Sequence, residues 1–252
     1  MSKAVYGDWI LSSSPAKIAE YFKVNGLLSP IVVNTVGILD PKKSQSQIEK
    51  VNVDFPLKLL DAIEPCNGRL ATFGTILEEF PDLCEFNPYL ASKLKLSNAL
   101  RATESNVASN FVHFRLHTWY GGLHLQPHMF LGEMINAINS NEVFHMSSGK
   151  QLREYHHIED DVDCIIQLLE NNMGGILQIN HGDARPISEI AQNIFRYFDK
   201  ESLLDIDYSS EPPGENLLTR FQPFKLSSSI TFRPIFPNLT SYLERFANYD
   251  KK

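Results

Sequence analysis

Two kinds of hydrophobic pattern alternate along the chain. Short runs of apolar and β-branched residues indicate strands that are buried on both faces of a sheet. These runs lie at residues 30–37, 68–75, 110–116 and 175–180. Between and after them, apolar residues recur at helical spacing and predict helices. A strand and a helix that alternate about every 30 residues are typical of a parallel sheet with crossover helices, so the pattern predicts an α/β fold.

Capping signals mark where several of the helices begin. Ser14 followed by Pro15 indicates an N-cap and a first helical position. Asp160 or Asp161 is expected to cap a later helix in the same way. Further helices are predicted at residues 48–60, 88–100, 127–139, 187–198 and 239–246. Residues 1–8 are predicted to form a strand that ends in a turn.

The composition is that of a folded soluble protein. Of 252 residues, 43% are hydrophobic and 21% are charged, and no apolar run reaches the length of a membrane helix. The first residues lack the apolar core of a secretory signal, so we expect a cytoplasmic location. Cys66, Cys84 and Cys164 are scattered, which suggests neither a disulfide framework nor a zinc-ligand spacing. The net charge of −7 argues against a general nucleic-acid surface.

Tyr89 and Lys93 are the first candidates for chemistry. Residues four positions apart lie on one face of a helix. A free tyrosine has a pKa of about 10, and a neighbouring cation lowers that pKa because it favours the phenolate. The pair is therefore suited to proton transfer near neutral pH. The alternative is an aromatic residue at a helix start beside a solvated lysine.

Thr75 ends the predicted strand at 68–75, and open α/β sheets bind their ligands at the carboxyl ends of strands. With Thr75, Tyr89 and Lys93 in this order, the chain resembles the extended short-chain dehydrogenase/reductase family, specifically its nucleotide-sugar epimerases, dehydratases and ketoreductases. The resemblance implies that Tyr89 is the general acid/base, that Lys93 is its electrostatic partner and that Thr75 orients the substrate oxygen.

Two later segments also resemble this family. Residues 115–121 carry an Arg-Leu-x-x-x-Tyr-Gly pattern, with Tyr120 as its tyrosine and Thr118 at a position that is commonly a polar amide. Residues 149–162 match a pattern in which Arg153 grips the substrate pyrophosphate, for which a guanidinium is well shaped. The resemblance therefore implies that Arg153, Tyr120 and Thr118 bind the substrate. An exposed cation paired with the neighbouring glutamate is the alternative for Arg153.

The resemblance also implies a fold and a cofactor. The expected fold is a Rossmann-like parallel sheet, shortened at its N-terminus, with a small C-terminal substrate-binding lobe. We predict a Rossmann-like core with an incomplete dinucleotide-binding half at 1–125, and a mixed core and substrate-binding lobe at 126–252. NAD or NADP is the implied cofactor. The residues implied on the cofactor side are Asp8, Asn34, Asn52, Tyr89 and Lys93, although capping of a strand and a helix is an equal alternative for the two asparagines.

The usual pyrophosphate-binding turn is missing from this sequence. No Gly-x-x-Gly-x-x-Gly segment occurs, and the serines at 12–14 are a poor substitute as anion donors. Three explanations stand: a shortened product, a divergent fold that rebuilds the sheet edge by dimerisation, or a pseudoenzyme. Because an open sheet edge promotes association, we expect a homodimer.

The predicted function is that of an NAD(P)-dependent oxidoreductase or epimerase of a nucleotide sugar, in cell-surface polysaccharide biosynthesis. The short distance in sequence from Thr75 to Tyr89 resembles the deoxysugar ketoreductases and favours reduction of a 4-keto sugar. The alternative is a non-catalytic member that binds a nucleotide sugar or a partner protein, which the missing glycine turn favours. The sequence selects neither the sugar and its nucleotide nor NAD over NADP.

Two polar clusters have less specific interpretations. His117, His124 and His128 follow a predicted strand, but structural zinc sites usually bring tighter spacing and cysteine, so no metal is expected. An acidic stretch before Tyr89 is expected to be a solvated loop, with a second acid/base among its carboxylates as the alternative. The acidic residues are Glu78, Glu79, Asp82 and Glu85.

Overall fold

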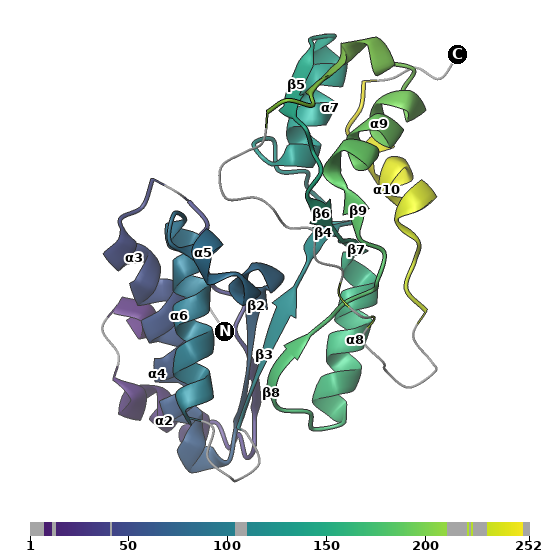
Figure 1. Ribbon diagram of the computed structural model, residues 1–252. Coiled ribbons are helices and arrows are strands. Elements are labelled where there is room, and N and C mark those ends of the chain that lie inside the picture. The colour runs from purple at the N-terminus through teal and green to yellow at the C-terminus, as the bar shows by residue number, and fades with distance from the viewer. Residues whose placement is uncertain are drawn as a thin grey trace. The chain divides into compact units, whose positions relative to one another are not determined.

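The computed structural model of the chain contains two compact units (Figure 1). The residues that it describes are 8–11, 14–40, 42–103, 110–210, 221, 223 and 231–248. The first unit comprises Met1–Leu116 and Glu170–Gln178, and the second comprises His117–Leu169 and Ile179–Lys252. None of the helices in the described part of the chain combines the length and the apolar composition that a membrane span requires.

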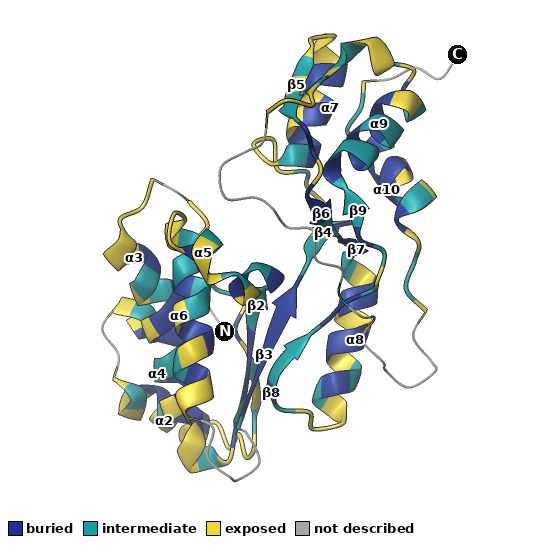
Figure 2. Ribbon diagram, in the orientation of Figure 1, coloured by how far each residue is buried: buried dark blue, intermediate teal, exposed yellow. Residues whose placement is uncertain are grey.

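A four-stranded parallel sheet forms the centre of the first unit. Its order is β1 (Ile31–Val33), β2 (Arg69–Thr75), β3 (Phe111–Leu116) and β8 (Gly175–Gln178). All six residues of β3 are buried (Figure 2), as expected for an apolar run in a parallel sheet. The predicted α/β fold with a parallel sheet is therefore confirmed, although the first strand is shorter than the run that predicted it.

Helices of the first unit cover one face of this sheet. Both α4 (Phe55–Ile63) and α6 (Pro88–Thr103) contact β2 and lie on the same side of it (Figure 1). Their apolar faces pack in a core that includes Ile63, Leu96 and Phe111. The shorter elements are α3 (Gln45–Glu49), the π-helix η1 (Lys50–Asp54), η2 (Glu64–Cys66), η3 (Ile76–Glu79) and α5 (Pro81–Cys84).

The N-terminal helix α2 (Pro15–Val24) begins as predicted. The Ser14 hydroxyl accepts a hydrogen bond of 3.4 Å from the Lys17 amide, and Pro15 occupies the first helical position. The strand predicted at 1–8 lies outside the described residues except for Asp8, which is helical, so no strand or turn forms at that position.

The second unit has three pairs of strands and four helices among its described residues. The pairs are β4 (Thr118–Tyr120) with β7 (Tyr155–His157) and β5 (Phe144–Ser147) with β10 (Leu204–Asp207), both parallel, and β6 (Leu152–Arg153) with β9 (Arg185–Pro186), antiparallel. The helices are α7 (Phe130–Ser140), α8 (Ile158–Glu170), α9 (Ile187–Tyr197) and α10 (Ile235–Glu244), with the short η4 (Glu201–Leu203) before β10. Their core is rich in aromatic residues, including Phe195, Phe198 and Tyr242.

The predicted cap of α8 is wrong. This helix begins at Ile158, so Asp160 and Asp161 lie within its first turn. Their carboxylates bind other segments instead: Asp160 accepts a hydrogen bond of 2.7 Å from the Arg233 amide, and Asp161 accepts one of 2.5 Å from the Trp119 indole. Negative charge in the first turn still favours the helix through its dipole.

Candidate active site and a buried histidine cluster

Tyr89 and Lys93 lie on one face of α6. The Asn87 side chain caps this helix, because its Oδ1 accepts hydrogen bonds from the amides of Tyr89 (3.0 Å) and Leu90 (3.2 Å). The Lys93 Nζ lies 5.5 Å from the centroid of the Tyr89 ring. It also donates a hydrogen bond of 2.7 Å to the carbonyl of Phe73 in β2. The helix therefore brings the phenol and the ammonium together, near the end of a central strand.

The pKa of Tyr89 is shifted upward, which is opposite to the prediction. Burial raises the pKa of Tyr89, and the Glu78 carboxylate raises it further. Burial lowers the pKa of Lys93, and Glu78 opposes that shift. We predicted that Lys93 would lower the pKa of the phenol. Desolvation and a nearby negative charge both disfavour the phenolate, so Tyr89 holds its proton in this structure.

Thr75 stands at the carboxyl end of β2, two residues after the carbonyl that binds Lys93. Its Oγ1 accepts a hydrogen bond of 3.3 Å from the Leu77 amide, and its own amide donates one of 2.8 Å to Glu78 Oε1. This reciprocal pair is a capping box that starts η3. The capping box fixes the position of the Thr75 hydroxyl at the end of the strand.

Glu78 is buried, so the expectation of solvent exposure is wrong for this residue, whereas Glu79, Asp82 and Glu85 are exposed as expected. It accepts a hydrogen bond of 3.0 Å from Arg115 Nε and lies 3.2 Å from His113 Nε2. Burial raises the pKa of Glu78, but His113, the Thr75 amide and Arg115 together lower that pKa below its ordinary value. Sequence reasoning missed the network because its members come from separate segments. The alternation of His113 and Arg115 along β3 was the available signal, since it puts both on one face.

Asn52 is fixed by contacts within the first unit. Its Oδ1 accepts from the Ile38 amide (2.7 Å), and its Nδ2 donates to the Ile38 carbonyl (3.0 Å) and to Ser92 Oγ (3.0 Å). A Cβ on Gly37 would lie 3.5 Å from Asn52 Oδ1 and 4.0 Å from Lys93 Nζ. The loop after β1 therefore runs beside Lys93.

Asn34 and Asp8, the other two residues predicted on the cofactor side, lie in different local surroundings from Asn52. Asn34 follows β1, and its Oδ1 accepts a hydrogen bond of 3.2 Å from the Val36 amide, which shapes the turn. Asp8 is exposed in the helical residues 8–11. Their roles in binding a cofactor stay predictions.

A cavity of about 640 Å³ lies within the second unit. Thr118 and Arg153, two of the three residues predicted to bind the substrate, line it together with Gln151 and Tyr155. Tyr120 is buried instead, and burial raises its pKa to about 12. The Tyr120 hydroxyl has no hydrogen-bond partner among the described residues.

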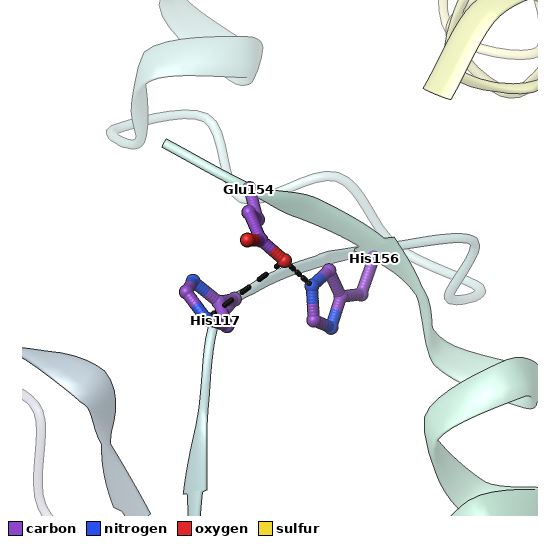
Figure 3. A group of neighbouring side chains, drawn as sticks. All are labelled: His117, Glu154 and His156. Carbon is purple, nitrogen blue, oxygen red and sulfur yellow. Dashed lines mark hydrogen bonds and ion pairs between the residues drawn. The ribbon is translucent and has the colours of Figure 1, made fainter. Parts of the chain in front are cut away.

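The second unit also contains a buried cluster of histidines and carboxylates. His117, Glu154 and His156 face one another at the start of the β4–β7 pair (Figure 3). Asp161 and His181 extend the cluster on the other side of His156. The sequence places His117 close to His124 and His128, but the pairing of strands distant in sequence gives it Glu154 and His156 as neighbours. The doublet at 156–157 within a strand was the signal that could have found them.

Comparison with known proteins identifies the family. Residues 13–180 match the model of the NAD dependent epimerase/dehydratase family. This chain belongs to that family. The resemblance inferred from Thr75, Tyr89 and Lys93 and from the later segments is therefore confirmed at the level of the family. The comparison with curated proteins found no significant match.

Solved structures of similar fold are distant in sequence. UDP-N-acetylglucosamine 4-epimerase from Methanobrevibacter ruminantium M1, in complex with UDP-N-acetylmuramic acid, is 17% identical with a TM-score of 0.68, over 94% of this chain and 79% of that chain. MoeE5 in complex with UDP-glucose and NAD is 17% identical with a TM-score of 0.69, over 94% and 83%. The dTDP-glucose 4,6-dehydratase from Bacillus anthracis in complex with NAD is 12% identical with a TM-score of 0.68, over 92% and 77%. These likenesses support the fold.

Proposed function

We propose that this protein is an NAD(P)-dependent oxidoreductase of nucleotide sugars that reduces a 4-keto sugar. The observation that carries the proposal is the pair of Tyr89 and Lys93, whose ring centroid and Nζ are 5.5 Å apart. Membership of the family and the NAD and UDP-glucose bound by a solved relative of similar fold support the choice of cofactor and substrate.

The protonation state of Tyr89 favours reduction. Burial and Glu78 raise the pKa of the phenol, so its resting form carries a proton. When a carbonyl is reduced, its oxygen gains negative charge and then takes up a proton. A protonated phenol can donate that proton, whereas oxidation of an alcohol would need the phenolate at the start.

We assign the nicotinamide-ribose end of a dinucleotide to the surroundings of Lys93. Gly37 lies close to this ammonium, since a Cβ at the glycine would be 4.0 Å from Lys93 Nζ. The reduced cofactor would supply the hydride. Tyr89 would donate its proton to the carbonyl oxygen, Thr75 would donate a hydrogen bond to that oxygen, and Lys93 would stabilise the phenolate that remains. We assign the nucleotide of the substrate to the cavity lined by Arg153 and Thr118.

A non-catalytic role is the second candidate. The cavity in the second unit is lined by residues of that unit alone, so a nucleotide sugar could bind there without a dinucleotide.

The deciding experiment measures oxidation of NADH and NADPH with a panel of UDP- and dTDP-linked 4-keto sugars. Tyr89→Phe should lower kcat by at least about 100-fold, because the phenolic proton is lost. Tyr208→Phe is the matched control, since that ring is 60% exposed in the second unit, and its kcat should be unchanged. Equal kcat for Tyr89→Phe and the wild type would exclude the assignment. Stabilisation by a nucleotide sugar, without any turnover or binding of NADH or NADPH, would favour the non-catalytic role.

The cytoplasmic location and the homodimer stay predictions. Strand β1 is at the edge of the sheet formed by the described residues, and Ile31 and Val33 are about half exposed there. An apolar edge strand supports association. Light scattering after size-exclusion chromatography would measure the molar mass of the protein in solution, and twice the mass of one chain would support the homodimer.

A further inference from the structure

Parallel pairing of β4 with β7 gathers three potential metal ligands at one point. The register pairs Thr118 with Tyr155, so His117 and Glu154 stand side by side just before the pair. Glu154 and His156 are two residues apart and therefore lie on the same face. The three side chains converge, with both imidazoles directed at one carboxylate oxygen (Figure 3).

The distances between the donor atoms are those of a nearly formed metal site. Glu154 Oε2 lies 3.0 Å from His156 Nε2 and 3.9 Å from His117 Nε2. A tetrahedral zinc ion with bonds of about 2.0–2.2 Å keeps its ligand atoms roughly 3.3 Å apart, between these two values. Asn180 Oδ1 lies 2.9 Å from His117 Nε2 and offers a further oxygen donor beside that ring. Glu154 Oε2 also accepts hydrogen bonds from the amides of His181 (2.7 Å) and Gly182 (3.1 Å), which hold this oxygen in place. A cation would replace the hydrogen bond between Glu154 and His156.

Asp161 stands behind His156 in the position of an outer-shell carboxylate. Its oxygens lie 3.0 and 3.1 Å from His156 Nδ1. A hydrogen bond from Nδ1 leaves Nε2 as the nitrogen that can bind a metal, and it fixes the orientation of the ring. Asp161 is itself held by the Trp119 indole and by His181 Nε2, so this support is rigid.

The cluster also brings two carboxylates into a buried place. Glu154 is 2% exposed and Asp161 is fully buried, and each lies within hydrogen-bond distance of His156. A divalent cation here would offset carboxylate charge that is costly to bury uncompensated.

One further feature points to a ligand at this place. The second carboxylate oxygen of Glu154, Oε1, is buried and has no hydrogen-bond partner among the described residues. A cation bound by both oxygens of this carboxylate would give Oε1 a partner.

We propose that His117, Glu154 and His156, with the Asn180 side-chain oxygen, bind a structural divalent cation of the zinc type. Imidazole and carboxylate ligands suit this metal, and the burial of the set is typical of a closed structural site. The neighbouring set of His156, Asp161 and His181 is a poorer site. The rings of His156 and His181 stack at 3.4 Å and 5°, so their in-plane lone pairs run parallel and do not converge.

The test measures zinc bound by the full chain after removal of metal with a chelator, incubation with Zn²⁺ and desalting. The wild type should retain one equivalent and unfold at a higher temperature than the metal-free protein. His128→Gln, which changes an exposed histidine of the same unit, should behave like the wild type. His117→Gln and Glu154→Gln should lose the bound zinc. Asp161→Asn should bind about 10–100-fold more weakly, because it removes the carboxylate behind His156.

Substitution with Co²⁺ gives a readout that does not depend on how the variants fold. The wild type loaded with Co²⁺ should show the intense visible bands of a four-coordinate site. A wild type that binds neither metal, or a folded Glu154→Gln that retains a full equivalent of zinc, would overturn the proposal. A weak octahedral Co²⁺ spectrum would also overturn it, because it would place the ion among water ligands at the surface.

Discussion

The ammonium of Lys93 lies 5.5 Å from the ring centroid of Tyr89 and donates a hydrogen bond of 2.7 Å to the carbonyl of Phe73. In the proposed reaction, proton transfer leaves a phenolate beside this ammonium. Lys93→Met keeps the length of the side chain but removes the charge. We expect kcat to fall at least about 100-fold, since the phenolate loses its stabilising cation.

The matched control for this change is Lys95→Met, on the same helix. Lys95 is exposed and pairs with Glu49 at 2.5 Å, so its loss should leave kcat unchanged. Steady-state kinetics of both variants, with the pH profile of kcat, checks the prediction. If Lys93→Met turned over at the wild-type rate, the ammonium would have no part in proton transfer.

Glu78 should make the free energy of unfolding depend on pH in the acidic range. Its pKa in the folded state is lowered, because hydrogen bonds to His113 and the charge of Arg115 outweigh burial. A lowered carboxylate pKa stabilises the protein above the unfolded value of about 4.3, and that stability is lost as the pH falls through the folded pKa. We expect the free energy of unfolding to fall as the pH drops below about 5, and Glu78→Gln to flatten this dependence.

Near neutral pH the same variant should be about 2 kcal/mol less stable, because the buried Arg115 loses the charged hydrogen bond to Glu78 while it keeps its ion pair with Glu79. Urea unfolding at several pH values measures both effects. Glu85→Gln changes an exposed carboxylate of the same segment and should leave the free energy of unfolding within about 0.5 kcal/mol of the wild type. A Glu78→Gln curve parallel to that of the wild type would assign the acid sensitivity to other groups.

Local signals predicted the elements of this fold well. The apolar runs found the four parallel strands, and Ser14 with Pro15 marked the start of α2 correctly. Helical spacing placed Tyr89 and Lys93 on one face. These features depend on residues within about one turn or one strand of each other, which the sequence displays directly.

The electrostatics could not be predicted from the same signals. Glu78 was expected in solvent, yet it pairs with Arg115 on β3, 37 residues further on. His117 meets Glu154 and His156 only because β4 pairs with β7. Such contacts depend on which strands become neighbours and in what register, and burial then reverses the expected direction of the Tyr89 pKa.

Asn52 should contribute more to stability than to catalysis. Its amide makes three hydrogen bonds that join the Ile38 backbone to Ser92. Asn52→Ala should therefore lower the free energy of unfolding by about 3 kcal/mol without any cofactor, at roughly 1 kcal/mol per bond. Asn136→Ala, which removes one exposed bond of 3.2 Å, should cost less than about 1 kcal/mol. Unchanged stability with a raised KM for NADH would make Asn52 a cofactor ligand instead.

Gly74 in β2 leaves the space that the buried Glu78 and His113 side chains fill. A Cβ at this position would lie less than 3.0 Å from Glu78 Oε1 and His113 Nε2. Both atoms belong to buried, hydrogen-bonded side chains, so neither can move aside without breaking the network. Gly74→Ala should therefore lower the free energy of unfolding by about 3 kcal/mol, the upper range for overpacking of a core.

Gly122→Ala is the control for this change, because a Cβ there would meet nothing within 4 Å. Its free energy of unfolding should stay within about 0.5 kcal/mol of the wild type. Differential scanning calorimetry or urea unfolding compares the two variants directly. If Gly74→Ala were as stable as Gly122→Ala, the Glu78 and His113 side chains would have room to rearrange. The charge that raises the pKa of Tyr89 would then not be fixed in place, and the argument for a protonated phenol in the resting enzyme would rest on burial alone.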